Sequence, residues 1–194
     1  MNNLPKGSFD ETSHEKTLLT HNRIPLFIWL LLLILLSPVI TRSQSVEYHV
    51  KASLIFKIAQ YTEWNSTQNS EAFQIAVLGK SPFKGEFEKL ASRFKIKGKS
   101  IKIRYIKDYK EAEGAQVLFI CQTEKKNIQK TILAFQSKNI LLISDSPDFS
   151  GEGVHFNFFT QNDETIHFEI DLEALKNSGL KPDLQLVSIG KIIH

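Results

Sequence analysis

Cysteine is almost absent from this chain of 194 residues, because Cys121 is the only one. An intrachain disulfide is therefore impossible, and the cysteine content does not decide between an oxidising and a reducing compartment. The net charge is also small, at +3, and the lysines are spread along the chain. Nothing resembles the basic surface that neutralises many phosphates, so we expect no nucleic-acid partner.

Glycine-rich phosphate-binding motifs are missing as well. The chain contains neither G-x-G-x-x-G nor G-x-x-x-x-G-K-[ST], so a nucleotide cofactor has no motif support and we expect none. Hydrophobic residues make up 42% of the chain and charged residues 23%, which is the balance of a folded protein. The length suits one domain with a core of its own.

One long apolar segment stands near the N-terminus. Residues 24–40 carry no charge, Arg23 precedes them, and the Leu-rich part ends at Ser37-Pro38. A short apolar region followed by small residues is typical of a secretory signal, here with cleavage at Ser43 or Ser45. An uncleaved single-pass anchor is the alternative, because the polar leader is long. Both interpretations predict export, with residues 1–45 as signal or anchor and residues 46–194 as the exported domain.

The middle of the chain alternates between strand and helix patterns. Apolar runs predict strands at 73–79, 116–121 and 140–143, and alternation of apolar and basic residues predicts one at 101–105. Helices are predicted at 46–61, from Pro82 to Phe94, at 109–112 and at 127–136. Such alternation is typical of an α/β domain. We expect a mainly parallel sheet flanked by helices in a Rossmann-like, three-layer arrangement.

The last third of the chain differs in character. Residues 154–159 and 165–171 both alternate between apolar and polar side chains, which predicts a C-terminal antiparallel hairpin. Matching the apolar faces pairs Phe156 with Ile170 and Phe158 with Phe168. A helix at 172–177, ended by Gly179, and an amphipathic helix at 184–193 are predicted to follow.

The first predicted helix has more apolar surface than one packing face needs. Its main stripe consists of Val50, Leu54, Ile58 and Tyr61, and a second side consists of Ala52, Ile55, Phe56 and Ala59. Either the helix is buried between layers or one side contacts a partner. The candidate partner-binding residues are Ile55 and Phe56 here and Leu184, Leu186 and Ile189 in the last helix.

Three loops follow predicted parallel strands, at 79–81, 121–123 and 144–146. Ligands in open α/β sheets bind at the carboxyl ends of the strands, where such loops converge. Ser81, Ser144 and Asp145 are therefore candidate ligand-binding residues, although ordinary strand-to-helix turns explain the same pattern. Cys121 has no base spaced to activate it, so we expect a buried structural cysteine.

The polar face of the predicted hairpin gathers potential metal ligands. His155 lies opposite Asp171 and Asn157 opposite Glu169, with His167 on the same face. Imidazoles and carboxylates suit zinc, and a metal-assisted hydrolase is one hypothesis. The residues lack a compact spacing such as H-E-x-x-H, so a solvated hydrogen-bonded face is the preferred interpretation.

Short motifs in a fixed order resemble the YfiR-like family of bacterial periplasmic proteins over about residues 50–193. They are Lys51-Ala52 through Glu63-Trp64, Val77-Leu78-Gly79 with Pro82-Phe83, Val117 to Ile120, Ile143-Ser144-Asp145 with Phe149 and Gly153, Phe168 to Asp171, and Leu184 to Ile189. The chain departs from the family's usual residues at Asp171 and at Cys121.

The resemblance implies a periplasmic repressor, not an enzyme, that binds the outer part of an inner-membrane diguanylate cyclase and so restrains cyclic-di-GMP synthesis and biofilm formation. Similar domains also serve as inputs to histidine kinases, and family members can form homodimers. A small-ligand-binding sensor of the envelope is the alternative function. The family carries no catalytic residues that could be transferred to this chain.

Overall fold

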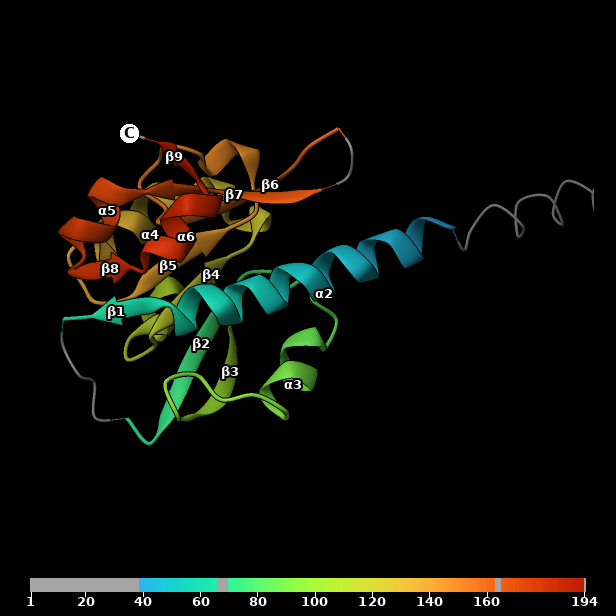
Figure 1. The fold of residues 1–194 in the computed structure, drawn as a ribbon, viewed down its shortest axis with the longest axis horizontal. Helices are drawn as coiled ribbons and strands as arrows, with labels where there is room; N and C mark the ends of the chain where they lie inside the picture. The colour runs from blue at the N-terminus through green and yellow to red at the C-terminus, as the bar shows by residue number, and fades with distance from the viewer. Residues whose placement is uncertain (1–38, 66–69, 163–164, 194) are drawn as a thin grey trace, which may run out of the picture. The chain divides into compact units, whose positions relative to one another are not determined.

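A seven-stranded sheet organises the domain (Figure 1). The computed structural model describes residues 39–65, 70–162 and 165–193. The strands of the sheet are β2 (Ala72–Leu78), β3 (Ser100–Ile106), β4 (Val117–Ile120), β5 (Leu141–Ser144), β6 (Phe156–Thr160), β7 (Ile166–Asp171) and β9 (Lys191–Ile193), in the spatial order β3-β2-β4-β5-β6-β7-β9. The first five in this order are parallel. The predicted mainly parallel α/β architecture is therefore confirmed.

The strand order is more specific than the sequence-based expectation. Counted along the chain, the five parallel strands lie in the order second-first-third-fourth-fifth, with the direction of winding reversed between β2 and β4. Doubly wound sheets of the flavodoxin type have this order, whereas dinucleotide-binding sheets have the order 3-2-1-4-5-6. This switch point lies between β2 and β4. The predicted ligand loops meet beside it, at the carboxyl ends of the parallel strands.

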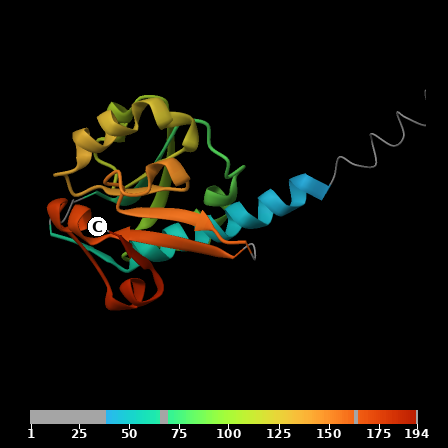
Figure 2. The same cartoon turned by 90° about the horizontal axis from the view of Figure 1, so that it is seen from above.

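Helices cover both faces of the sheet (Figures 1 and 2). The α-helices are α2 (Val39–Gln60), α3 (Glu86–Ala91), α4 (Ile128–Phe135), α5 (Leu172–Asn177) and α6 (Leu184–Ile189), and the 3-10 helices are η1 (Tyr109–Ala112), η2 (Gln122–Asn127) and η3 (Pro147–Phe149). Side chains of α2 and α3 pack in one core cluster, whereas those of α4, η1 and η3 pack in another. Alternate residues of the central strands point into these two clusters, as the apolar runs require.

Two short strands make a small second sheet. β1 (Thr62–Trp64), directly after α2, pairs antiparallel with β8 (Leu180–Pro182), directly before α6. The backbone N–H of Asp183 also donates to the carbonyl of Tyr61. The end of α2 and the start of α6 are therefore held side by side. Neither strand has a sequence pattern long enough to predict it.

β6 and β7 pair antiparallel in the predicted register. Phe156 lies opposite Ile170, and Phe158 lies opposite Phe168. A slip by one residue would turn these side chains out of the core, so burial of one face selects the register. The predicted loop of this pair includes residues 163–164, which lie outside the described residues.

Helix α2 is longer than predicted, and it buries its second apolar side together with Ile58 of the main stripe. It begins at Val39 and passes without a break through the predicted domain boundary at residue 45. Its second apolar side is buried, including Ile55 and Phe56, whereas Val50 and Tyr61 of the predicted main stripe are exposed. Residues 1–38 of the predicted signal or anchor segment lie outside the described residues, and its last part, residues 39–45, belongs to α2. Within the described residues, no helix has both the length and the apolar character needed to span a bilayer.

Two predicted helices have different limits in the structure. The helix expected from Pro82 begins only at Glu86, after Gly85 with a φ of 86°, and Phe94, expected on its buried stripe, is exposed. The helix expected at 184–193 ends at Ile189, and residues 191–193 form β9 along the edge of β7. A methyl group on Gly190 would lie 2.4 Å from Ile170 Cδ1. Glycine therefore lets the chain turn against the sheet at this point.

Candidate functional site

The carboxyl ends of β2, β4 and β5 meet at one edge of the sheet, because the three strands are parallel. The loops after β2 and β4 are joined there by a hydrogen bond from the Lys80 backbone N–H to Thr123 Oγ1, at 3.0 Å. Gly79 has a φ of 92°, and a Cβ on it would lie 2.6 Å from Thr123 Oγ1. The predicted convergence of loops is confirmed, and close packing of the loops themselves explains this glycine.

A buried ion pair crosses this edge of the sheet. Lys51 Nζ of α2 lies 3.1 Å from Asp145 Oδ2, which follows β5, and each side chain is only 5% exposed. Lys51 Nζ also lies 2.6 Å from Glu47 Oε1, one turn earlier in α2. Removing a charge from water is costly, and a close partner of opposite charge offsets that cost. The pair therefore fixes α2 to the end of β5.

Tyr48 of α2 also contacts the Asp145 carboxylate. Burial and the negative charge of Asp145, to which its hydroxyl donates a hydrogen bond, raise the pKa of Tyr48 well above its usual value. Lys51 Nζ lies 4.8 Å from the centre of the Tyr48 ring, and this ring packs edge-on against Phe83 at 5.2 Å. Asp145 is thus engaged by two side chains of α2, which argues for a structural role and against ligand binding.

Cys121 lies in the core close to the same carboxylate. Burial, the charge of Asp145 and the charge of Glu124 raise the pKa of the Cys121 thiol to about 12. The thiol is therefore protonated at neutral pH and is a poor nucleophile. The predicted burial of this cysteine is confirmed.

The two serines among the predicted ligand residues lie in different surroundings. Ser144 is fully buried, and its Oγ accepts a hydrogen bond from the Ser146 N–H at 3.3 Å. Ser81 borders a pocket of about 270 Å³, whose lining residues are Tyr48, Lys80, Ser81, Pro82, Phe83, Lys84 and Glu86. Of the three predicted ligand residues, Ser81 alone lines this pocket.

His155 is a structural group of the core. Its Nδ1 accepts a hydrogen bond from the Leu142 N–H at 2.9 Å, and its Nε2 lies 2.9 Å from Ser178 Oγ. The Ser178 hydroxyl donates to the Gln136 carbonyl, so Nε2 carries the proton and donates to Ser178. Burial lowers the pKa of His155 to about 3. The neutral ring therefore connects β5, β6 and the end of α5.

The other potential metal ligands are engaged separately. Asp171 Oδ1 accepts from the Ala174 N–H at 2.8 Å and caps α5, and His167 bonds to Thr165 and stacks on Phe159. Burial alone would raise the pKa of Glu169, but hydrogen bonds from Ser150 and Lys191 outweigh it and lower the pKa. In the part of the chain that the structure describes, no group of three or more His, Cys, Asp or Glu side chains is arranged to hold a metal ion.

The predicted partner-binding residues divide into buried and exposed ones. Ile55 and Phe56 face the core, so the interpretation of this side of α2 as buried between layers is the one that the structure supports. In α6, Leu186 is buried, whereas Leu184 is 83% exposed and Ile189 is 65% exposed. Leu184 and Ile189 thus remain available to a partner.

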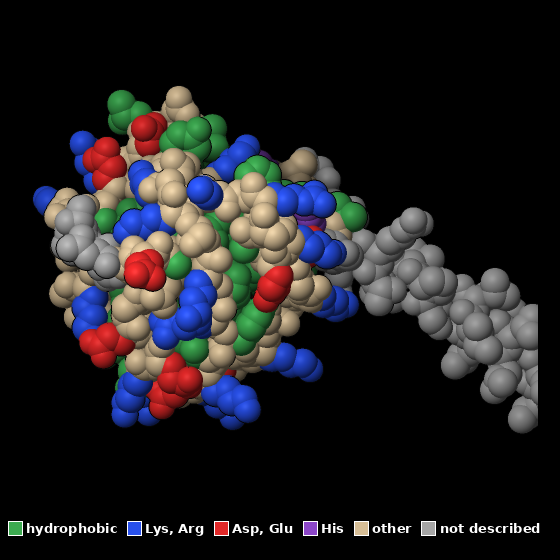
Figure 3. All heavy atoms as spheres, turned by 90° about the horizontal axis from the view of Figure 1, so that it is seen from below, with side chains coloured by type: hydrophobic (Ala, Val, Ile, Leu, Met, Phe, Trp, Pro, Cys, Tyr) green, Lys and Arg blue, Asp and Glu red, His purple; other side chains and the backbone are tan. Residues whose placement is uncertain are grey.

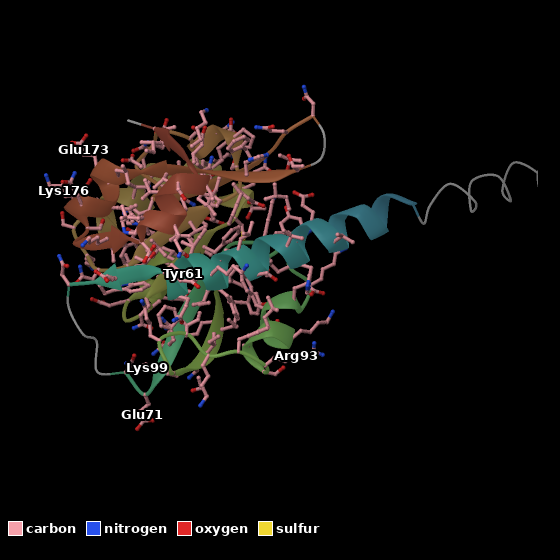
Figure 4. All side chains as sticks on the ribbon, viewed as in Figure 1. Tyr61, Glu71, Arg93, Lys99, Glu173 and Lys176 are labelled. Carbon is pink, nitrogen blue, oxygen red and sulfur yellow. The ribbon has the colours of Figure 1, made fainter. Side chains whose placement is uncertain are left out.

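Sequence reasoning missed the contact between Lys51 and Asp145. Both residues belong to motifs of the family resemblance, and Asp145 also stood out by its place in a strand-end loop, but no sequence pattern indicated that the two residues meet. Figure 4 shows the side chains of the domain on the ribbon, with Tyr61 at the end of α2 and Glu173 and Lys176 on α5. His155 and Asp171 border one hollow of about 590 Å³, but the contacts of both residues hold elements of the fold together.

The fold and these contacts define an α/β domain whose strand-end site is closed by a buried ion pair. A model of the YfiR/HmsC-like family matches residues 48–191. The chain therefore belongs to this family, whose members are regulatory proteins that act with a membrane signalling protein. No match was found among curated proteins.

A solved structure supports the fold. The domain is similar to a conserved domain protein from Vibrio cholerae O1 biovar El Tor, with a TM-score of 0.52 and 10% sequence identity. The match covers 75% of this chain and 59% of that protein, so the chain spans somewhat more than half of its length. At this identity the likeness concerns the fold alone.

Proposed function

We propose that this protein is an exported regulator that binds the periplasmic part of an inner-membrane signalling protein, a diguanylate cyclase or a related histidine kinase, and represses it. The observation that carries the proposal is the match of the YfiR/HmsC-like family over residues 48–191. The apolar segment at residues 24–40 supports export, by cleavage or as an anchor.

The side chains of the domain agree with a binding role. The candidate nucleophile Cys121 is buried with a raised pKa, and His155 is held neutral by backbone and serine partners. Both groups contribute to packing, whereas Leu184 and Ile189 are exposed on α6. Large apolar side chains on a surface are suited to protein contacts.

The proposal is tested with the full chain, tagged at its C-terminus, in the native bacterium. We expect it in the cell envelope, cross-linked to a membrane signalling protein. Deleting its gene should raise cyclic-di-GMP several-fold, and restoring the gene should reverse the rise. Recovery only in the cytosol with an intact N-terminus contradicts export. An unchanged cyclic-di-GMP level, together with unchanged kinase output, contradicts repression.

A small-ligand sensor is the second candidate function, favoured by the pocket of about 270 Å³ beside Ser81. Native mass spectrometry of protein purified from the envelope should then find a bound molecule, and Ser81→Trp should remove it. The variant Ser100→Trp, at an exposed position of β3 away from this pocket, is the matched control. A ligand-free protein with normal repression would leave the pocket without a role.

A further inference from the structure

An apolar groove lies between the second half of α2 and the chain that follows α3. It has a volume of about 400 Å³, and its lining residues are Ser53, Phe56, Lys57, Gln60, Tyr61, Leu90, Phe94, Lys95 and Ile96. Phe56, Leu90 and Ile96 are buried at its base, whereas Tyr61 and Phe94 are exposed at its rim. The groove therefore has a concave apolar base between two aromatic side chains.

Phe94 is the exposed aromatic that sequence periodicity placed in the core. It is 56% exposed, although its backbone N–H still bonds to the Leu90 carbonyl at 2.9 Å. A single exposed phenylalanine is common on protein surfaces. Here it stands beside an apolar hollow, and this combination is typical of a binding site for a side chain of another protein.

The far wall of the groove is a tight turn that is fixed to α2. Ile96 and Lys99 exchange two backbone hydrogen bonds, of 3.1 and 2.9 Å, around Lys97 and Gly98, which both have positive φ. The Lys97 N–H also donates to Gln60 Oε1 of α2 at 2.7 Å. The groove is therefore formed before any partner binds, which lowers the entropic cost of binding.

The charged residues that line the groove are all of one sign. Lys57 and Lys95 line it, no acidic residue does, and every charged residue between Arg93 and Lys99 is basic. Within the described residues, neither Lys57 nor Lys95 forms an ion pair. Figure 3 shows hydrophobic side chains on the face seen from below, with lysine and arginine side chains and a smaller number of Asp and Glu side chains around them. Figure 4 shows Tyr61 at the end of α2 and Arg93 just beyond α3.

We propose that this groove is the docking site for an amphipathic, acidic segment of the membrane signalling protein. Apolar side chains of that segment fill the hollow between Phe94 and Tyr61, and its Asp and Glu side chains pair with Lys57 and Lys95. This inference rests on the proposed function and adds the surface and the chemistry of the partner. Complementary charge speeds the encounter and selects the partner, while the apolar contacts supply affinity.

An anionic lipid surface shares part of this chemistry, but it fits the shape less well. A flat bilayer surface could reach Phe94 and the lysines, yet it would leave the hollow above Phe56 and Ile96 unfilled. A protein side chain can enter the hollow and bury the apolar base. The concave shape therefore favours a protein segment.

The first test places a photo-cross-linking phenylalanine analogue at position 94 of the full chain in the native bacterium, with position 133 as the control. Leu133 is 64% exposed and belongs to α4, on the other face of the sheet. Mass spectrometry should find that position 94 reacts with a peptide of the membrane partner that contains apolar residues flanked by Asp or Glu. A cross-link to residues 1–38 or to a second copy of the chain, or none to an acidic segment, overturns the proposal.

The second test measures affinity for the purified periplasmic part of the membrane protein recovered by cross-linking. Phe94→Ser and the double variant Lys57→Glu/Lys95→Glu should each weaken binding at least tenfold, and the double variant should bind with less salt dependence. Leu133→Ser should bind like the wild type. All three variants change exposed side chains, so their melting temperatures should stay close to that of the wild type.

The outcomes separate this inference from the proposed function. If a membrane signalling protein is bound and the groove variants bind it as Leu133→Ser does, the groove is not the docking site, although the regulatory role stands. If no membrane signalling protein is bound, both proposals fail. Binding of the wild type to phosphatidylglycerol vesicles that the groove variants lose, with unchanged protein binding, assigns the groove to lipid instead.

Discussion

Lys51 and Asp145 are 94 positions apart in the sequence, yet the ammonium and carboxylate groups lie 3.1 Å apart and are almost completely buried. The pair joins α2 to the carboxyl end of β5, at the edge where an open α/β sheet ordinarily binds ligands. In this domain the edge is therefore used to hold a helix.

Loss of Lys51 should be strongly destabilising. In Lys51→Met the Asp145 carboxylate keeps its Tyr48 contact but loses its buried counter-charge, and breaking a buried pair in this way costs about 3–5 kcal/mol. Urea unfolding followed by circular dichroism measures the change. Lys125→Met is the matched control, because the pair of Lys125 with Asp148 is exposed and should contribute about 0–1 kcal/mol. Equal effects of the two substitutions would contradict a structural role for the buried pair.

His155 should make the stability of the domain depend on pH. The folded-state pKa of about 3 lies below the ordinary value of 6.5, so the unfolded chain binds the proton more readily. Stability is then fully present above about pH 6.5 and falls with decreasing pH toward 3, by about 1.4 kcal/mol per pH unit. Glu86 and Glu169 have lowered pKa values, and their contributions are lost only below their ordinary value of 4.5.

Denaturant unfolding between pH 7 and 5.5 therefore separates the contribution of His155 from those of Glu86 and Glu169, and a variant of His155 separates it from those of the other histidines. His155→Gln should be less stable than the wild type at pH 7 by about 1–3 kcal/mol, because the Leu142 N–H loses its acceptor and the Ser178 oxygen loses the ring N–H that donates to it. Its stability should also change less between the two pH values. A variant that keeps the full slope of the wild type would assign the pH dependence to other groups.

Periodicity in the sequence predicted the strands of the sheet well, because each central strand is buried on both faces and therefore reads as an apolar run. Periodicity failed where the sequence allows more than one face or more than one kind of element to be buried. Helix α2 carries two apolar sides, and only the sheet beneath it selects the side with Ile55 and Phe56. The residues Ile192 and Ile193 suit a helix or a strand equally well, and the free edge of β7 decides for a strand.

The site was harder to predict than the fold for a related reason. The sequence located the strand-end loops, since these follow directly from the order of elements. The ion pair between Lys51 and Asp145 depends on how α2 crosses the sheet. No local sequence pattern encodes that crossing. Phe94 fits the spacing of a helical stripe, but α3 ends at Ala91. The alternation of basic and apolar residues after that point was the one available sign of a surface segment.

Residue 190 should have to be glycine, because the neighbouring side chains leave no space for a Cβ atom. Its φ of −94° is allowed for any residue, but an added methyl group would lie 2.4 Å from Ile170 Cδ1 and 2.7 Å from Phe168 Cε2. Overpacking of this kind costs about 1–3 kcal/mol, so Gly190→Ala should lower the melting temperature. Ile170→Val removes the nearest atom, and it should therefore be better tolerated in the Gly190→Ala background than alone. Additive effects of the two substitutions would exclude this contact as the cause.

The exposed residues of α6 should matter for association and little for folding. Leu184 and Ile189 are largely exposed, so Leu184→Asp and Ile189→Asp should change the free energy of unfolding by no more than about 0.5 kcal/mol. If α6 contributes to the partner interface, each variant should raise cyclic-di-GMP in the native bacterium at normal protein level. Leu186→Asp is the contrasting variant, because it places an unpaired charge in the core and should unfold the domain. Normal repression by both surface variants, with the protein folded and abundant, would exclude α6 from the interface. Loss of a large apolar contact at the centre of an interface weakens binding measurably.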